Sequence, residues 1–299
     1  AVASNTVGMV AVDPEGTTLT YFDRSTFTIK EQALSWSTEN SPEASAEAPT
    51  VRPALFYDED GTTLAVVDLL TGDYSVFRFN GGRLQKESVV GPCPGLGAKA
   101  DGSFRLRAGS FSLAADALLL GDDSGNLFRI GLAACDDYSS QINLGGNAIL
   151  KISPGSDGNV FVAQQNIIRQ VSREGESLTV SKTQAIACHH PTSVTAIGAD
   201  QAHLAVTCLT PSNYDPATED PPLLVEYATV NLQVYPRGSA ELTASYAIAS
   251  AAVTGQGLVS ETGRLHVVYK GVFGRMETID LLTGATETRN NVLIDDILE

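Results

Sequence analysis

The chain has 299 residues, of which 43% are hydrophobic and 18% charged. A chain of this length can bury a large core, as one big domain or two ordinary ones. It carries 19 Lys and Arg against 35 Asp and Glu, a formal net charge of −16. This charge repels nucleic acid and anionic membranes, so neither is an expected partner. The longest apolar run, near residues 245–253, is too short for a transmembrane segment.

Alternating apolar and polar residues predict β-strands along the chain. The alternation is clearest over residues 8–13, 63–69, 74–79, 265–269 and 276–281. These runs are rich in Val, Ile, Thr, Tyr and Phe, the residues that favour strands. Residues 30–37 are the nearest helix candidate, but they lack an apolar stripe at helical spacing. The prediction is an all-β protein: a propeller, a large sandwich or a barrel.

Internal repeats favour the propeller. Val12–Leu19 (VDPEGTTL) matches Tyr57–Leu64 (YDEDGTTL), and Val67–Gly72 (VDLLTG) matches Ile279–Gly284 (IDLLTG). The last two copies need not join the same pair of strands in their blades. Further copies of the turn-then-strand pattern begin at Asp116, Asp157, Asp200 and Glu261.

Six copies predict a single six-bladed β-propeller over residues 1–299, with four-stranded antiparallel blades. Seven blades are the alternative. The expected blades cover residues 5–38, 51–90, 108–144, 147–186, 192–247 and 248–291. The C-terminal segment 292–299 is apolar enough to form a strand, and we expect it to pair with the first blade and close the ring.

One repeat resembles a known family. Ile152–Ala163 (ISPGSDGNVFVA), followed by Ile168–Val171, is similar to the NHL or YVTN-type propeller repeat, as is Asp123–Ile130 (DSGNLFRI). The resemblance implies a propeller with a broad range of functions: protein and ligand binding, lactone or ester hydrolysis, or scaffolding. Trp-Asp dipeptides are absent from the sequence, and the single Trp36 argues against the tryptophan-docked quinoprotein propellers.

The four cysteines indicate a compartment. No C-x-x-C spacing occurs, so neither a zinc ribbon nor a thioredoxin motif is supported. We expect disulfides Cys188–Cys208, which would staple one strand pair, and Cys93–Cys135; four buried thiols in a cytosolic protein are the alternative. The chain begins AVASNT, which resembles the product of signal-peptide cleavage. The expected location is therefore secreted, periplasmic or at the cell surface.

Two segments interrupt the strand pattern. Residues 38–50 (TENSPEASAEAPT) are acidic and predicted to be an exposed loop, and residues 210–222 (TPSNYDPATEDPP) form a proline-stiffened insertion in the fifth blade. We expect a binding face where loops that lead into first strands meet loops that join second and third strands. The residues expected on this face are His189, His190, Asn213, Tyr214, Asp215, Asp122 and Asp123. Tyr214 is the expected partner contact; the alternative is that the insertion covers a blade edge.

Few residues suggest a cofactor. Adjacent His189 and His190 offer metal ligands or a general base, although a structural pair is the simpler interpretation. Residues 58–60 and 122–126 hold several carboxylate oxygens, the ligands of Ca²⁺, but neither matches an EF-hand loop, and turn capping explains both. We therefore assign no metal site, and Ca²⁺ or another divalent ion is the only cofactor considered.

Two classes of function remain. We expect a non-catalytic extracytoplasmic propeller that binds a protein or glycan partner, because no catalytic motif occurs in a credible context. The alternative is a metal-assisted lactonase or ester hydrolase with a divalent ion in the central tunnel. Its candidate ligands would be His189, His190, Asn147 and Asp101.

Overall fold

The computed structural model describes most of the chain, and the structural statements below concern these residues alone. They are residues 2–4, 8–13, 18–23, 28–34, 53–58, 61–69, 72–80, 83–90, 106–111, 117–132, 140–155, 159–174, 177–211, 227–250, 255–259, 262–269 and 275–290. The predictions for loop 38–50 and for the C-terminal segment 292–299 lie outside them.

The described residues form six four-stranded antiparallel sheets. The first sheet consists of β1 (Val2–Ser4), β2 (Gly8–Val12), β3 (Thr18–Asp23) and β4 (Thr28–Ala33). The second sheet consists of β5 (Pro53–Tyr57), β6 (Thr63–Asp68), β7 (Tyr74–Asn80) and β8 (Arg83–Val90). The third sheet consists of β9 (Leu106–Phe111), β10 (Ala117–Asp122), β11 (Asn126–Gly131) and β12 (Ser140–Asn143).

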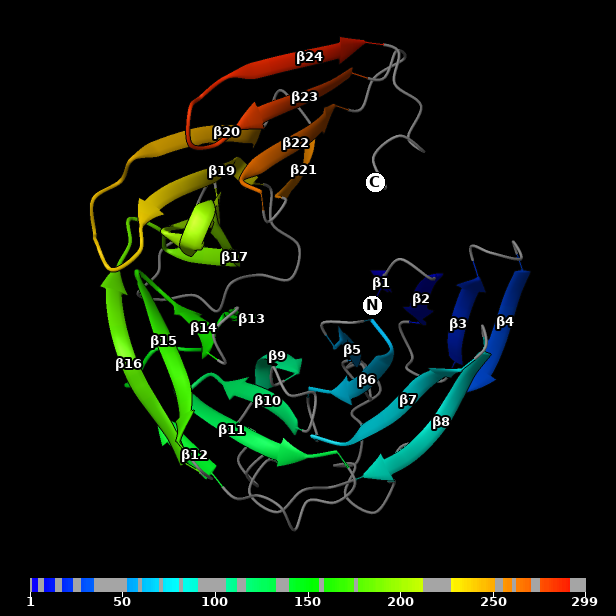
Figure 1. Cartoon of the computed structure of the whole chain (residues 1–299). Coiled ribbons are helices and arrows are strands. Elements are labelled where there is room, and N and C mark those ends of the chain that lie inside the picture. The colour runs from blue at the N-terminus through cyan, green and yellow to red at the C-terminus, as the bar shows by residue number, and fades with distance from the viewer. Residues whose placement is uncertain are drawn as a thin grey trace. The chain divides into compact units, whose positions relative to one another are not determined.

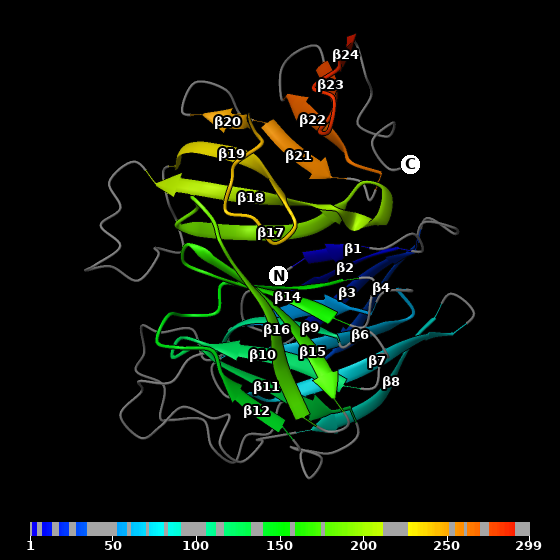
Figure 2. The ribbon, with the colours of Figure 1, turned by 60° about the vertical axis from the view of Figure 1, so that its left-hand side comes forward.

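The fourth sheet consists of β13 (Lys151–Pro154), β14 (Asn159–Gln164), β15 (Ile167–Glu174) and β16 (Ser177–Ala185). The fifth sheet consists of β17 (His190–Ile197), β18 (His203–Pro211), β19 (Tyr227–Pro236) and β20 (Ala244–Ser250). The sixth sheet consists of β21 (Gly255–Val259), β22 (Arg264–Tyr269), β23 (Arg275–Asp280) and β24 (Thr286–Asn290). In every sheet neighbouring strands follow one another in the chain, as the fifth sheet shows in Figure 2. Among the described residues, no helix is long and apolar enough to cross a membrane.

The six sheets confirm the predicted strand class and the predicted division into six four-stranded units (Figure 1). The largest differences in boundaries concern the first sheet, which begins at Val2 rather than at residue 5 and ends at Ala33 rather than at residue 38, and the sixth sheet, which begins at Gly255 rather than at residue 248. Strand β1 has only three residues, too few to show an alternating pattern in the sequence.

The first sequence repeat has a shared structural role. The Asp13 carboxylate accepts a hydrogen bond from the backbone N–H of Thr18 at 3.0 Å, and Asp58 accepts one from the N–H of Thr63 at 2.9 Å. In both copies the aspartate spans the turn and fixes the start of the next strand, which is why the repeat keeps Asp at this position.

The second repeat forms one kind of turn at two different places. The N–H of Gly72 donates to the carbonyl of Asp68, and that of Gly284 to the carbonyl of Asp280, both at 2.8 Å. Both glycines have positive φ, 80° and 73°, which glycine adopts without steric cost. The first copy joins the second and third strands of its sheet, whereas the second copy joins the third and fourth. The two copies therefore occupy different strand pairs.

The apolar core consists of clusters between consecutive sheets. The chain divides into two compact units, residues 1–160 with 172–179 and residues 161–171 with 180–299. In the first unit, one cluster joins the first two sheets and includes Tyr21, Leu64 and Phe77. Another cluster joins the second and third sheets, and its largest members are Tyr74, Phe111 and Phe128. In the second unit, a cluster around Phe161 and Tyr235 joins the fourth sheet to the fifth. A cluster around Leu232 and Leu265 joins the fifth sheet to the sixth. Neighbouring sheets thus bury their faces against one another, as propeller blades do.

Candidate functional site

Two backbone hydrogen bonds, which we call the Asn166 lock, fix the loop that leads from the fourth sheet into the fifth. This inter-sheet loop, residues 186–189, lies against the β14–β15 turn at Asn166. The N–H of Asn166 donates to the carbonyl of Cys188, and the N–H of Ile186 donates to the carbonyl of Asn166, both at 2.9 Å. Asn166 has φ 61°, a left-handed conformation that Asn tolerates better than most residues. The turn of one sheet therefore fixes the loop that follows.

The predicted disulfide between Cys188 and Cys208 is present, and its two Cα atoms lie 5.6 Å apart. Cys208 lies on β18, opposite Pro191 of β17, so the bond ties the inter-sheet loop to the strand pair that it enters. Both cysteines are buried in the apolar cluster around Phe161. A buried disulfide is typical of proteins from an oxidising compartment. The other predicted pair, Cys93 and Cys135, lies outside the described residues.

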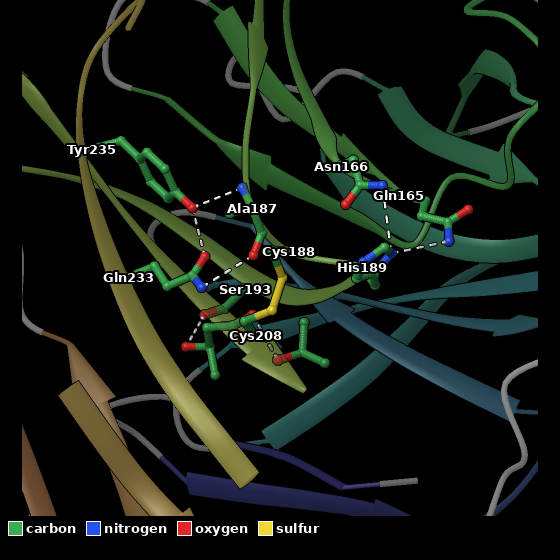
Figure 3. The surroundings of a disulfide bond; sticks show 11 residues. Gln165, Asn166, Ala187, Cys188, His189, Ser193, Cys208, Gln233 and Tyr235 are labelled. Atoms are coloured by element: carbon green, nitrogen blue, oxygen red, sulfur yellow. Dashed lines mark hydrogen bonds between the residues drawn. A yellow bond between two sulfur atoms is a disulfide. The ribbon is translucent and has the colours of Figure 1, made fainter. Parts of the chain in front are cut away.

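Tyr235 closes a small hydrogen-bonded ring on the same loop (Figure 3). Its hydroxyl accepts a hydrogen bond from the N–H of Ala187 at 3.0 Å and donates to Oε1 of Gln233 at 2.6 Å. Gln233 in turn donates from Nε2 to the carbonyl of Ala187 at 3.2 Å. Burial raises the pKa of the Tyr235 phenol, and the hydrogen bond from Ala187 opposes this only in part. The phenol therefore stays protonated and keeps its role as a donor.

The histidine of this loop is held among amide groups. His189 is exposed, and its Nδ1 lies 3.4 Å from Nε2 of Gln165 and 3.5 Å from Nδ2 of Asn166 (Figure 3). Both amide nitrogens are donors, so Nδ1 accepts and the ring proton is assigned to Nε2. We call His189, Gln165 and Asn166 the His189 surface. It presents uncharged donors and acceptors on a backbone that is fixed from two sides.

The predicted partner of this histidine lies on a different element. His190 is the first residue of β17, where it pairs with Leu209 and is half-buried. His189 lies in the loop before this strand, where its ring contacts Gln165 and Asn166. Within the described part of the chain, no three His, Cys, Asp or Glu side chains are close enough to hold a metal ion. Asn213, Tyr214, Asp215 and Asp101 lie outside that part.

Asp122 acts as a turn cap in the first unit. Its Oδ1 accepts from the backbone N–H groups of Ser124 and Asn126 at 2.9 and 2.7 Å, and its Oδ2 accepts from Nδ2 of Asn126 at 2.7 Å. The side chain is fully buried, whereas Asp123 is half-buried and reaches only the hydroxyl of Ser124, at 3.4 Å. The donors around Asp122 are N–H groups, which match a turn rather than a cation.

Backbone hydrogen bonds join the turn that Asp122 caps to a second inter-sheet loop, residues 144–150, which leads from the third sheet into the fourth. The N–H of Leu144 donates to the carbonyl of Gly125 at 2.8 Å, and that of Ile149 to the carbonyl of Asp122 at 2.9 Å. Asn147 lies exposed within this loop. In each unit, therefore, a turn between second and third strands lies beside a loop leading into a first strand, the pairing that was expected to build the binding face.

Replacing Asp122 by alanine is expected to lower the free energy of unfolding by about 2 kcal/mol, because two backbone donors and one side-chain donor lose their acceptor in a buried turn. Chemical denaturation followed by circular dichroism measures the change. The matched control is Asp123→Ala, expected within about 0.5 kcal/mol of the wild type. Equal effects of the two variants would show that the cap is not needed.

Sequence reasoning missed four residues of this region: Gln165, Asn166, Gln233 and Tyr235. Only Asn166 carried a usable signal, because an Asn between two strands favours a tight turn with positive φ. The other three make contacts between different sheets, which no local pattern reveals.

The comparisons with known proteins concern the fold. No protein-family model matches the chain, and no curated protein matches it in sequence. Among solved structures of propeller proteins, hydrazine synthase of Kuenenia stuttgartiensis is similar over 92% of this chain and 74% of its own, with 13% identity and a TM-score of 0.53.

A second structure, "Dihydro-heme d1 dehydrogenase NirN in complex with DHE", is similar over 96% of this chain, with 13% identity and a TM-score of 0.53. The present chain spans 54% of that chain. Identity this low shows the fold and nothing about ligands. The chain is thus an all-β protein of the β-propeller class, built from six four-stranded antiparallel sheets.

Proposed function

We propose that the protein is a non-catalytic, extracytoplasmic module that binds or assembles a protein or glycan partner through the His189 surface. The observation that carries this proposal is the fixed backbone of the inter-sheet loop. The disulfide, the Tyr235 ring and the Asn166 lock all hold residues 186–189, while His189 itself stays exposed. A surface fixed in advance loses little conformational entropy on binding.

The chemistry of this surface favours an uncharged, hydrogen-bonding partner. Amide groups and an imidazole form hydrogen bonds with sugar hydroxyls or peptide groups. The net charge of −16 disfavours a highly acidic partner such as a nucleic acid. Asn213, Tyr214 and Asp215 belong to the connection between the second and third strands of the fifth sheet, the sheet that His189 leads into. By sequence position they are part of the proposed face, with Tyr214 as its aromatic contact.

Two further observations support the proposal. The buried disulfide suits a secreted, periplasmic or cell-surface protein. The NHL or YVTN-type resemblance of the repeats suits a scaffold whose loops carry recognition.

The test places a photo-crosslinking residue at position 189 of the full chain in its native host. A matched protein carries it at position 241, where Glu241 is exposed on the β19–β20 turn. In parallel, an array of neutral oligosaccharides is probed with wild type, His189→Ala, Tyr214→Ala and Glu241→Ala. We expect adducts from position 189 and none from position 241, or glycan binding whose affinity falls about tenfold in His189→Ala, equivalent to about 1.4 kcal/mol, and is unchanged in Glu241→Ala.

Two results would count against the proposal. Equal adducts at positions 189 and 241, without glycan binding, would show that the His189 surface recognises nothing. A stoichiometric divalent ion retained through dialysis, together with lactone hydrolysis, would replace the proposal with the metal-assisted hydrolase. If Tyr214→Ala binds the oligosaccharides as well as the wild type does, the insertion of residues 210–222 takes no part in recognition.

A further inference from the structure

A small pocket lies between the fourth and fifth sheets of the second unit. Its apolar floor consists of Phe161 on β14, Ile168 on β15 and Leu204 on β18, all buried in one apolar cluster. In its present shape the hollow has room for about one water-sized group. The hollow therefore accepts a single atom of a ligand, which would lie between the apolar floor and the polar groups around it.

The polar rim is held in place by contacts between the two sheets. The Arg237 guanidinium lies over the Phe161 ring, 5.5 Å from its centroid, and its Nε donates to Oε1 of Gln170 at 3.4 Å. The N–H of Gly238 donates to Oε1 of Gln184 at 2.7 Å. The β19–β20 turn is thereby fixed onto β15 and β16, so the rim is formed before any ligand arrives.

The rim combines two positive charges with an unused donor. Lys182 and Arg237 both line the pocket, and no carboxylate is among its described lining residues, although the chain as a whole is strongly acidic. Gln184 is only 6% exposed, and its Nε2 has no hydrogen-bond acceptor among the described residues. Buried donors in native proteins are almost always paired, so this one indicates a missing acceptor.

We infer that this pocket binds a single carboxylate group. Arg237 and Lys182 supply charge-assisted hydrogen bonds to the carboxylate, the Gln184 amide supplies a further donor to the oxygen that enters the hollow, and the carbon stem of the ligand lies outside it. The size of the hollow admits only the tip of a ligand, such as a small carboxylic acid or the end of an acidic side chain of another protein. This site is independent of the His189 surface and of the partner proposed for it.

The experiment follows the Gly238 backbone amide and the Gln184 side-chain amide by NMR in the full ¹⁵N-labelled chain. Sodium acetate is titrated against sodium chloride at equal ionic strength and against neutral acetamide. We expect a saturable shift of both signals with acetate alone. A capped peptide with one glutamate distinguishes the sources: tighter binding than acetate assigns the site to an acidic protein segment, and weaker binding assigns it to a small carboxylic acid.

Two variants and a control decide the result. Lys182→Gln and Arg237→Gln are each expected to weaken acetate binding about tenfold, because each removes one charge-assisted bond. Arg289→Gln, on exposed β24, removes the same kind of charge elsewhere and should leave the affinity unchanged. Lys182 is exposed, so its replacement tests the proposal even if Arg237→Gln does not fold. Equal shifts with chloride and acetate, or equal affinities of Lys182→Gln and Arg289→Gln, would overturn it.

Discussion

Replacing Cys188 and Cys208 together by alanine is expected to lower the free energy of unfolding by at least about 3 kcal/mol. The bond joins residues 20 positions apart, and closing a loop of this length restricts the unfolded chain by about 3 kcal/mol in the chain-entropy model. Both cysteines are buried, so the alanines also leave unfilled space in the core. Urea unfolding under non-reducing conditions measures the difference.

A second double variant separates the two causes. Cys188→Val with Cys208→Val keeps apolar volume in the core but cannot form the bond. We expect it to retain most of the loss of the alanine variant, because the cross-link is the larger contribution. If the valine variant is as stable as the wild type, the bond adds little and packing explains the alanine result. Hydrogen exchange at the Asn166 and Ile186 amides, which bond the β14–β15 turn and the inter-sheet loop to each other, should be faster in both variants.

Gly125→Ala is expected to destabilise the protein by about 3 kcal/mol or more. A Cβ atom built at Gly125 would lie 1.9 Å from the carbonyl oxygen of Gly145 and 2.9 Å from that of Asn147. Both are backbone atoms of the next inter-sheet loop, and they cannot turn aside as a side chain does. The φ of Gly125 is also +80°, a conformation that alanine adopts only with strain. Thermal and urea denaturation give the change in stability.

The matched control lies in the loop that Gly125 touches. Gly146 has no atom within 4 Å of where its Cβ would be, and its φ is not positive. Gly146→Ala is therefore expected to change stability by less than about 0.5 kcal/mol. A loss below 1 kcal/mol in Gly125→Ala would mean that the β10–β11 turn does not lie against loop 144–150 in solution.

Local signals were enough to predict the strands and their grouping. The aspartates at positions 13 and 58 keep their place in the repeat because each one caps a turn. The glycines at 72 and 284 mark turns that need positive φ. The Cys188–Cys208 pair followed from its short separation, because these residues flank one strand pair. These features depend on neighbours in the chain, and a single sequence displays them.

The candidate sites depend on contacts between sheets, and these have no local signature. His189 was singled out as one of an adjacent pair, but its contacts come from Gln165 and Asn166 on another sheet. Lys182 and Arg237 look like ordinary surface cations until the fold brings β16 and the β19–β20 turn to one pocket. No spacing rule joins such positions, because the docking of two sheets sets their distance.

The locks at Asn166 and Gly125 also bear on how the length of this chain can change in evolution. The inter-sheet loops 144–150 and 186–189 are both bonded at the backbone to the turn beside them, so their number of residues is matched to the distance that they span. Adding or removing one residue there would shift the following first strand and exchange its buried and exposed faces. The β23–β24 turn, where residues 282–285 are all exposed, carries no such constraint toward a following sheet among the described residues. Length variation can therefore accumulate at such outer turns, while these two inter-sheet loops keep their length.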